Sequence, residues 1–152
     1  GIGSVMKDLS GLDQLHKMIA GELPPPRMAA LMDMGLAHVE EGEAIFTATA
    51  SLQHTNPMGG VHGGFAATVL DSATGCAVHS ALPPGRSYAT VDLSVQMIRP
   101  VPVGAQLEAI GKVLNVSKRV GFAEGWLQDK NGKRYAHATA TCAIFESQGP
   151  SA

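Results

Sequence analysis

Asp71 is a carboxylate within a run of small and apolar residues. The segment "NPMGGVHGGFAATVLD", residues 56–71, leads into a stretch that continues from Gly63 to about Ser80 without proline, which predicts one long helix. Asp has a poor helix propensity, and two turns into a helix it has no capping role. Its neighbours three and four positions away share its helical face and are all small: Ala67, Thr68, Thr74 and Gly75. Such a face can admit a ligand, and the ordinary alternative is a solvated carboxylate on an exposed helix.

His62-Gly63-Gly64 lies where this helix would begin. The first backbone N–H groups of a helix have no partner within it, and the positive end of the helix dipole lies there. Glycine lets a substrate carbonyl come close to the main chain, and an N–H aimed at the developing oxygen charge stabilises a tetrahedral intermediate. The tripeptide therefore indicates an oxyanion site, against the simpler interpretation of a glycine turn before a helix.

The surrounding elements predict an α+β domain. A short helix is expected around Leu12 to Ile19, because prolines 24–26 prevent its continuation. Residues 35–51 are predicted to form a β-hairpin that turns at Gly42. Four further runs with partial apolar alternation follow the long helix: residues 89–101, 105–120, 121–130 and 133–145. We expect the last four strands in antiparallel succession, in a sheet wrapped around one central helix.

The composition excludes several classes of protein. With 152 residues the chain has the size of one domain, and its net charge of −2 without a basic block argues against nucleic acid or anionic lipid as a partner. No run is long enough to span a bilayer and the start has no signal-peptide pattern, so a cytoplasmic protein is expected. Only 16% of the residues are charged, which favours an oligomer. The two cysteines read as reduced core residues, and the six histidines lack metal-ligand spacing.

Asn56, His62-Gly63-Gly64 and Asp71, nine residues beyond His62, form a pattern more specific than its parts. The pattern resembles the hotdog-fold acyl-CoA thioesterases of the PaaI-like, phenylacetate-pathway type. The resemblance extends from about residue 35 to residue 145 and includes the segments "TVD" at 90–92 and "MIRP" at 97–100.

The resemblance implies a hotdog fold, a homodimer that pairs again into a dimer of dimers (a homotetramer), and a site shared between two subunits. It implies that Asp71 acts as general base on water or as a nucleophile giving an anhydride, while the Gly63 N–H polarises the thioester carbonyl. Asn56 would hold the carbonyl or the attacking water. His62 would brace the loop, and Thr90 would lie near the water, unless it is a plain β-strand threonine.

The implied substrate is a coenzyme A thioester, with no further cofactor. Its phosphates need cations. The adjacent pair Lys118 and Arg119, at the bend after residue 116, is favoured over Arg99, Lys130 and Lys133. Apolar residues near the glycines are candidates for an acyl pocket. The substrate-binding residues expected on these grounds are Gly64, Met58, Phe65, Lys118 and Arg119.

These residues favour the hydrolysis of an acyl-CoA as the function, and the acyl group could be an aryl or arylacetyl group. A hotdog dehydratase or hydratase is the second reading, and a non-catalytic acyl-CoA-binding module is the third. We expect the hotdog domain at residues 34–147. It is preceded by a helix and proline-rich lead-in at 1–33 and followed by a tail at 148–152.

Overall fold

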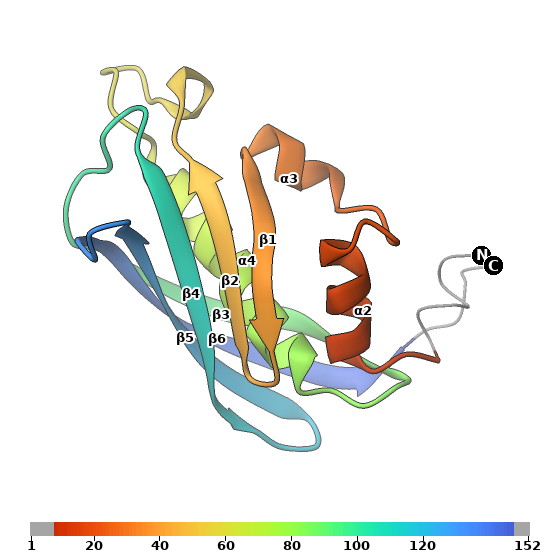
Figure 1. Ribbon diagram of the computed structural model, residues 1–152. Coiled ribbons are helices and arrows are strands. Elements are labelled where there is room, and N and C mark those ends of the chain that lie inside the picture. The colour runs from red at the N-terminus through yellow and green to blue at the C-terminus, as the bar shows by residue number, and fades with distance from the viewer. Residues whose placement is uncertain (1–7, 148–152) are drawn as a thin grey trace.

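A computed structural model of the chain describes residues 8–147 (Figure 1). The first seven residues and the expected tail at 148–152 lie outside this range. The structure is a curved sheet that holds one long helix against its inner face, with two short helices beside one edge. Its elements in chain order are α2 (Gly11–Ile19), α3 (Arg27–Leu31), β1 (Met34–Glu40), β2 (Glu43–Thr49), η1 (Leu52–His54), α4 (Gly63–Ser80), β3 (Arg86–Met97), β4 (Gln106–Val116), β5 (Val120–Asp129) and β6 (Arg134–Glu146).

All neighbouring strands are antiparallel, in the spatial order β1-β2-β4-β5-β6-β3. The expected succession of the last four strands is wrong in one respect, because β3 pairs with β6 and not with the next strand, β4. Antiparallel partners need not be consecutive, and alternation along a strand does not say which partner it takes. As a result β3 lies at one edge of the sheet, while α2 and α3 lie beside the other edge strand, β1 (Figure 1).

α4 has the predicted bounds, and one side of it forms the core with the sheet. Val69 and Leu70 are fully buried on this side, as is Leu127 on β5. These side chains belong to a cluster that also includes Ala109 of β4. Burial of an apolar side chain of this size stabilises the fold by about 1.5–3 kcal/mol, so this contact fixes where α4 lies.

Two paired glycines let α4 approach the sheet closely. Gly111 of β4 is opposite Gly125 of β5. A Cβ on Gly111 would overlap the carbonyl oxygen of Ala73 in α4. A Cβ on Gly125 would lie 3.1 Å from Cγ2 of Thr74. The helix backbone therefore rests directly on the two strands at this point.

The proline-rich lead-in contains a helix that the sequence did not predict. α3 begins directly after Pro26, which is in extended conformation at the N-cap. Proline ends a preceding helix but is compatible with the start of a new one, and the five residues that follow include good helix formers. α2 is held to α4 by a 2.8 Å hydrogen bond between Oε1 of Gln14 and Nε2 of His79.

Within residues 8–147, no helix is both long and apolar enough to cross a membrane.

Candidate active site

Asp71 and Thr90 are in direct contact. The Thr90 hydroxyl on β3 donates a 2.8 Å hydrogen bond to Oδ1 of Asp71 on α4. Both side chains are half-buried, so the carboxylate is held by the protein and still reachable from outside. The structure thus brings together two residues that sequence reasoning selected 19 positions apart.

The neighbours of Asp71 are neutral groups. The ring of Tyr88 packs on Gly75, where a Cβ would lie 2.8 Å from the ring. Burial raises the pKa of the Cys76 thiol to about 12, and it raises the pKa of the Tyr88 phenol as well. Neither group exchanges protons near neutral pH.

The start of α4 presents one unused backbone donor. The ring of His62, at the N-cap, accepts a 2.8 Å hydrogen bond at Nδ1 from the Gly64 N–H. The Phe65 N–H donates to the His62 carbonyl and the His62 N–H donates to the His54 carbonyl. In the part of the chain that the structure describes, no acceptor takes the N–H of Gly63. The free donor is therefore at the residue that sequence reasoning chose for the oxyanion role.

His62 itself is fixed by this cap. Because Nδ1 accepts a hydrogen bond, the ring proton of the neutral imidazole is on Nε2. The geometry fits a residue that braces the loop.

Asn56 organises the loop before α4. Its Oδ1 accepts hydrogen bonds from the N–H groups of Met58 (3.0 Å) and Gly60 (3.2 Å). Its backbone N–H donates to the Gly60 carbonyl at 2.7 Å. Asn56 also lines a cavity of about 430 Å³ together with Gly63 and Arg99. The Asn56 carboxamide oxygen is thus engaged within the loop, while the residue borders the cavity that Gly63 also lines.

Gly63 and Asp71 do not meet within one chain. They are eight positions apart on α4, and a helix rises 1.5 Å per residue, so about 12 Å of helix separates them. A thioester carbonyl bound at one of them lies out of reach of the other.

The predicted substrate-binding residues are dispersed. Gly64 adjoins Gly63, but its N–H is used by the cap. Met58 is 92% exposed, whereas Phe65 is buried in the core with its ring 4.8 Å from that of His54. Lys118 and Arg119 lie exposed in the turn between β4 and β5. This turn is next to the C-terminal end of α4, since Val116, two residues before Lys118, packs with Val78 and Leu82.

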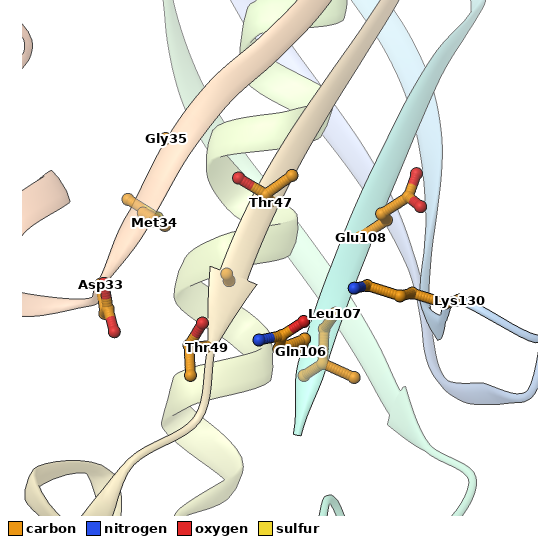
Figure 2. A pocket seen from close by; sticks show the side chains of 10 residues that line it. Asp33, Met34, Gly35, Thr47, Thr49, Gln106, Leu107, Glu108 and Lys130 are labelled. Carbon is orange, nitrogen blue, oxygen red and sulfur yellow. The ribbon is translucent and has the colours of Figure 1, made fainter. Parts of the chain in front are cut away.

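A second hollow of about 420 Å³ lies over β1, β2 and β4 and contains none of the five predicted catalytic residues (Figure 2). Lys130 reaches toward β4 from the turn after β5, and Thr47 and Glu108 stand on the neighbouring strands. Among residues 8–147, His, Cys, Asp and Glu side chains form no group of three that could hold a metal ion.

Comparison with known proteins decides the family. The family model described as "Thioesterase superfamily" matches residues 58–136, which is more than half of the chain and includes His62, Gly63, Asp71 and Thr90. The chain belongs to the thioesterase superfamily.

Solved structures similar to this chain agree with the family. A phenylacetic acid degradation-related protein from Ralstonia eutropha JMP134 is 30% identical, with a TM-score of 0.78 over 85% of this chain and 98% of that one. The E. coli PaaI protein from the phenylacetic acid degradation operon is 21% identical and shows the same fold, with a TM-score of 0.77 over 93% of this chain and 97% of that one. The hotdog fold and the PaaI-like resemblance are thereby confirmed.

Acyl-coenzyme A thioesterase 13 of Mus musculus is 31% identical over 90 residues, which are 59% of this chain and 64% of that protein. The chain spans between 44% and 64% of the length of the curated relatives that it matches.

Sequence reasoning missed one neighbour of the Asp71–Thr90 pair. Tyr88 covers Gly75 beside Asp71, and it was not selected. A signal was available, since Tyr88 precedes Thr90 by two positions and alternate residues of a strand share one face.

Proposed function

We propose that this protein hydrolyses acyl-CoA thioesters to the free acid and coenzyme A, in a site shared by two copies of the chain. The family and the name of the mouse relative support thioester hydrolysis. The observation that carries the proposal is the pair of features on α4: a carboxylate held by Thr90, and a free Gly63 N–H at the helix start.

The distance between these features supports a shared site. Because about 12 Å of helix separates Gly63 from Asp71, a second copy must supply the Gly63 N–H that acts with a given Asp71. Within residues 8–147, no further strand pairs with the outer edge of β3, which carries Thr90, and Val91 on this strand is 64% exposed. An open edge with unpaired backbone groups suits pairing with an identical strand, and antiparallel pairing is two-fold symmetric.

In the general-base route, Asp71 removes a proton from water while the water oxygen attacks the thioester carbonyl carbon. The oxygen of the tetrahedral intermediate accepts the Gly63 N–H of the other copy. Collapse of the intermediate breaks the carbon–sulfur bond, and the coenzyme A sulfur leaves and takes up a proton. Thr90 occupies one carboxylate oxygen, so the other is available to the water.

In the nucleophilic route, the Asp71 carboxylate attacks the carbonyl carbon itself and expels the thiolate. The resulting anhydride is then opened by water, which returns the carboxylate and releases the acid. Both routes use the same residues in the same places, with Asn56 and His62 shaping the loop that presents Gly63.

The residues that meet the coenzyme A phosphates remain a prediction. Arg99 lines the cavity in front of Gly63, whereas Lys118 and Arg119 lie near the other end of α4. Antiparallel pairing that brings Asp71 of one copy to Gly63 of the other leaves the C-terminal end of α4, nine residues beyond Asp71, roughly 13 Å past that Gly63. Lys118 and Arg119 stay predicted candidates alongside Arg99.

The competing functions make different use of these residues. A dehydratase or hydratase needs a histidine free to move a proton at the acyl α-carbon, and the His62 ring is engaged with the Gly64 N–H. A binding module without catalysis has no need for a carboxylate held beside the bound carbonyl. Assembly as a dimer of dimers and a cytoplasmic location are part of the proposal.

Release of free thiol from acetyl-CoA, hexanoyl-CoA and phenylacetyl-CoA, with mass analysis of the acyl product, tests the proposal. Hydrolysis yields coenzyme A and the unmodified acid. A changed acyl chain still attached to coenzyme A would support the dehydratase or hydratase, and binding without release would support the non-catalytic module.

A further inference from the structure

Gly75 is a buried glycine in the interior of α4. Glycine inside a helix lowers stability relative to alanine, because the unfolded chain has more conformations to lose. The backbone of Gly75 is helical and its φ is not positive, so no unusual conformation requires glycine here. The reason for a residue without a side chain must therefore be sought in packing.

The contact that explains this glycine is with the ring of Tyr88 on β3. A Cβ at position 75 would lie 2.8 Å from Cε2, 2.8 Å from the phenol oxygen and 3.1 Å from Cζ of Tyr88. The ring has neighbours on its other sides, since the His79 ring centroid is 5.5 Å away and the cluster that contains Val78 and Leu82 packs against it. Rotation of Tyr88 alone is thus restricted, and a side chain at position 75 would press on β3.

This contact is next to the hydrogen bond between Thr90 and Asp71. Asp71 precedes Gly75 by four residues, which is about 6 Å of helix. Thr90 follows Tyr88 by two residues on the same strand face, about 7 Å away. The two contacts are consecutive points along the line where α4 meets β3. The spacing at the first contact therefore sets the spacing at the second.

The hydrogen bond from the Thr90 hydroxyl to Asp71 is 2.8 Å long and tolerates little displacement. Carbon atoms in contact are ordinarily about 3.5 Å or more apart, so a Cβ at position 75 would need roughly 0.7 Å of extra room. The same displacement at Thr90 would lengthen the hydroxyl–carboxylate distance to roughly 3.5 Å, beyond the range of about 2.5–3.0 Å that such bonds have.

We propose that Gly75 is a positioning residue of the hydrolase: by admitting the Tyr88 ring, it holds β3 close enough to α4 for Thr90 to bond to the Asp71 carboxylate. The inference rests on the proposed hydrolase function. Gly75 acts through Tyr88 and Thr90 and contributes no group of its own to the reaction.

Alanine at position 75 tests this role, alone and in two backgrounds. Gly75→Ala is combined with Tyr88→Leu, which removes the three close ring atoms, and with Thr90→Val, which removes the hydroxyl. The kcat and KM of wild type, the single variants and the two double variants are measured with whichever of acetyl-, hexanoyl- and phenylacetyl-CoA wild type hydrolyses fastest. Urea unfolding measures the stability of each protein.

We expect Gly75→Ala to lower kcat by roughly 10- to 100-fold, because misplacement of a catalytic contact by less than about 1 Å is enough for such a loss. KM should change by less than about 3-fold. In the Tyr88→Leu background the overlap is absent, and in the Thr90→Val background the hydrogen bond is already lost. Adding Gly75→Ala should therefore change kcat by no more than about 2-fold in either background.

Gly121 of β5 is the matched control, since a Cβ there would also lie 2.8 Å from a neighbour, Cγ1 of Val78 in α4. Val78 is seven residues beyond Asp71, which is about 10 Å of helix. Gly121→Ala should lower the stability toward urea and leave kcat within about 2-fold of the wild-type value.

A Gly75→Ala enzyme with wild-type kcat would overturn the positioning role, as would an equal loss of kcat in all three backgrounds or in Gly121→Ala. Thr90→Val with wild-type kcat would overturn it too, because Gly75 would then have nothing to position. If Gly75→Ala alone does not fold, Gly75→Ala/Tyr88→Leu decides: the kcat of Tyr88→Leu supports the role, and a further loss overturns it. Wild type that releases thiol from none of the three thioesters would overturn the proposed function together with this inference.

Discussion

The contact between Asp71 and Thr90 joins the central helix to the open edge strand, and it sets the first prediction. Asp71→Asn should fold, since the Asn carbonyl oxygen can accept the same Thr90 hydrogen bond. An amide neither takes a proton from water nor attacks a carbonyl, so kcat should fall by roughly 10²–10⁴. Turnover of phenylacetyl-CoA measures the loss.

Asp13→Asn, at an exposed carboxylate of α2, is the control for charge removal and should leave kcat unchanged. An Asp71→Asn enzyme with near-wild-type kcat on its best thioester would remove Asp71 from the mechanism.

Gly63 gives a second prediction, because it is the first residue of α4. Proline is well tolerated at that position, and His62 already has the extended conformation that a residue before proline prefers (φ −64°, ψ 136°). Gly63→Pro therefore removes the free N–H with little cost to the helix. We expect kcat to fall by roughly 10²–10³, with a smaller change in KM.

Gly63→Ala retains the N–H and is the matched control; its Cβ would lie 3.3 Å from the flexible end of Met97. If proline and alanine at position 63 impaired turnover equally, crowding rather than a lost donor would explain the effect.

The close approach of α4 to the sheet depends on Gly111. An added Cβ there overlaps the backbone of Ala73, which cannot rotate away as a side chain can. Gly111→Ala should therefore lower the free energy of unfolding by about 1–3 kcal/mol or more, the usual cost of overpacking. Urea unfolding measures the change.

Gly35→Ala in β1 is the comparison, because a Cβ at Gly35 has no atom within 4 Å and its φ is not positive. A Gly111→Ala protein as stable as Gly35→Ala would mean that the helix and sheet separate more easily than the structure indicates.

The elements also show what a sequence can and cannot predict. The bounds of α4 followed from a long proline-free apolar run, and the β1–β2 turn followed from Gly42, whose φ is +85°. The pairing of β3 with β6 did not follow, because strand alternation carries no information about the partner. α3 was missed since prolines 24–26 were read only as an end of structure.

Asp71 and Gly63 were selected by chemical type and spacing, whereas the roles of Asn56, His62 and Thr90 were implied by the family resemblance. The structure adds how these residues lie relative to one another. The Asp71–Thr90 hydrogen bond depends on how β3 lies against α4, and the free Gly63 N–H depends on the His62 cap. The distances of Lys118 and Arg119 from the glycines depend on strand length and order, which local pattern does not set.

Mixing two inactive variants tests whether the site is shared between two copies of the chain. Gly63→Pro and Asp71→Asn are unfolded together in equal amounts and refolded, so that about half of the dimers are mixed. In a shared two-fold site, a mixed dimer has one site with both lesions and one site with neither. Recovered activity should approach roughly a quarter of the wild-type value.

Each variant refolded alone is the control and should stay inactive. If native mass spectrometry detects mixed dimers and activity does not return, each site is built within a single chain.

The register of β3 and β6 also sets an order of events when the chain is made. Thr90 pairs with Cys142, 52 positions later, so the strand that holds Thr90 beside Asp71 gains its partner only after those residues have been synthesised. At about 5–20 residues per second, synthesis of this intervening stretch takes roughly 3–10 s. Through that interval α4 and β3 exist without β6 to align them. The contact between Asp71 and Thr90 is therefore among the last parts of a newborn chain to form, and a nascent chain arrested before β6 should contain the carboxylate without its hydroxyl partner in place.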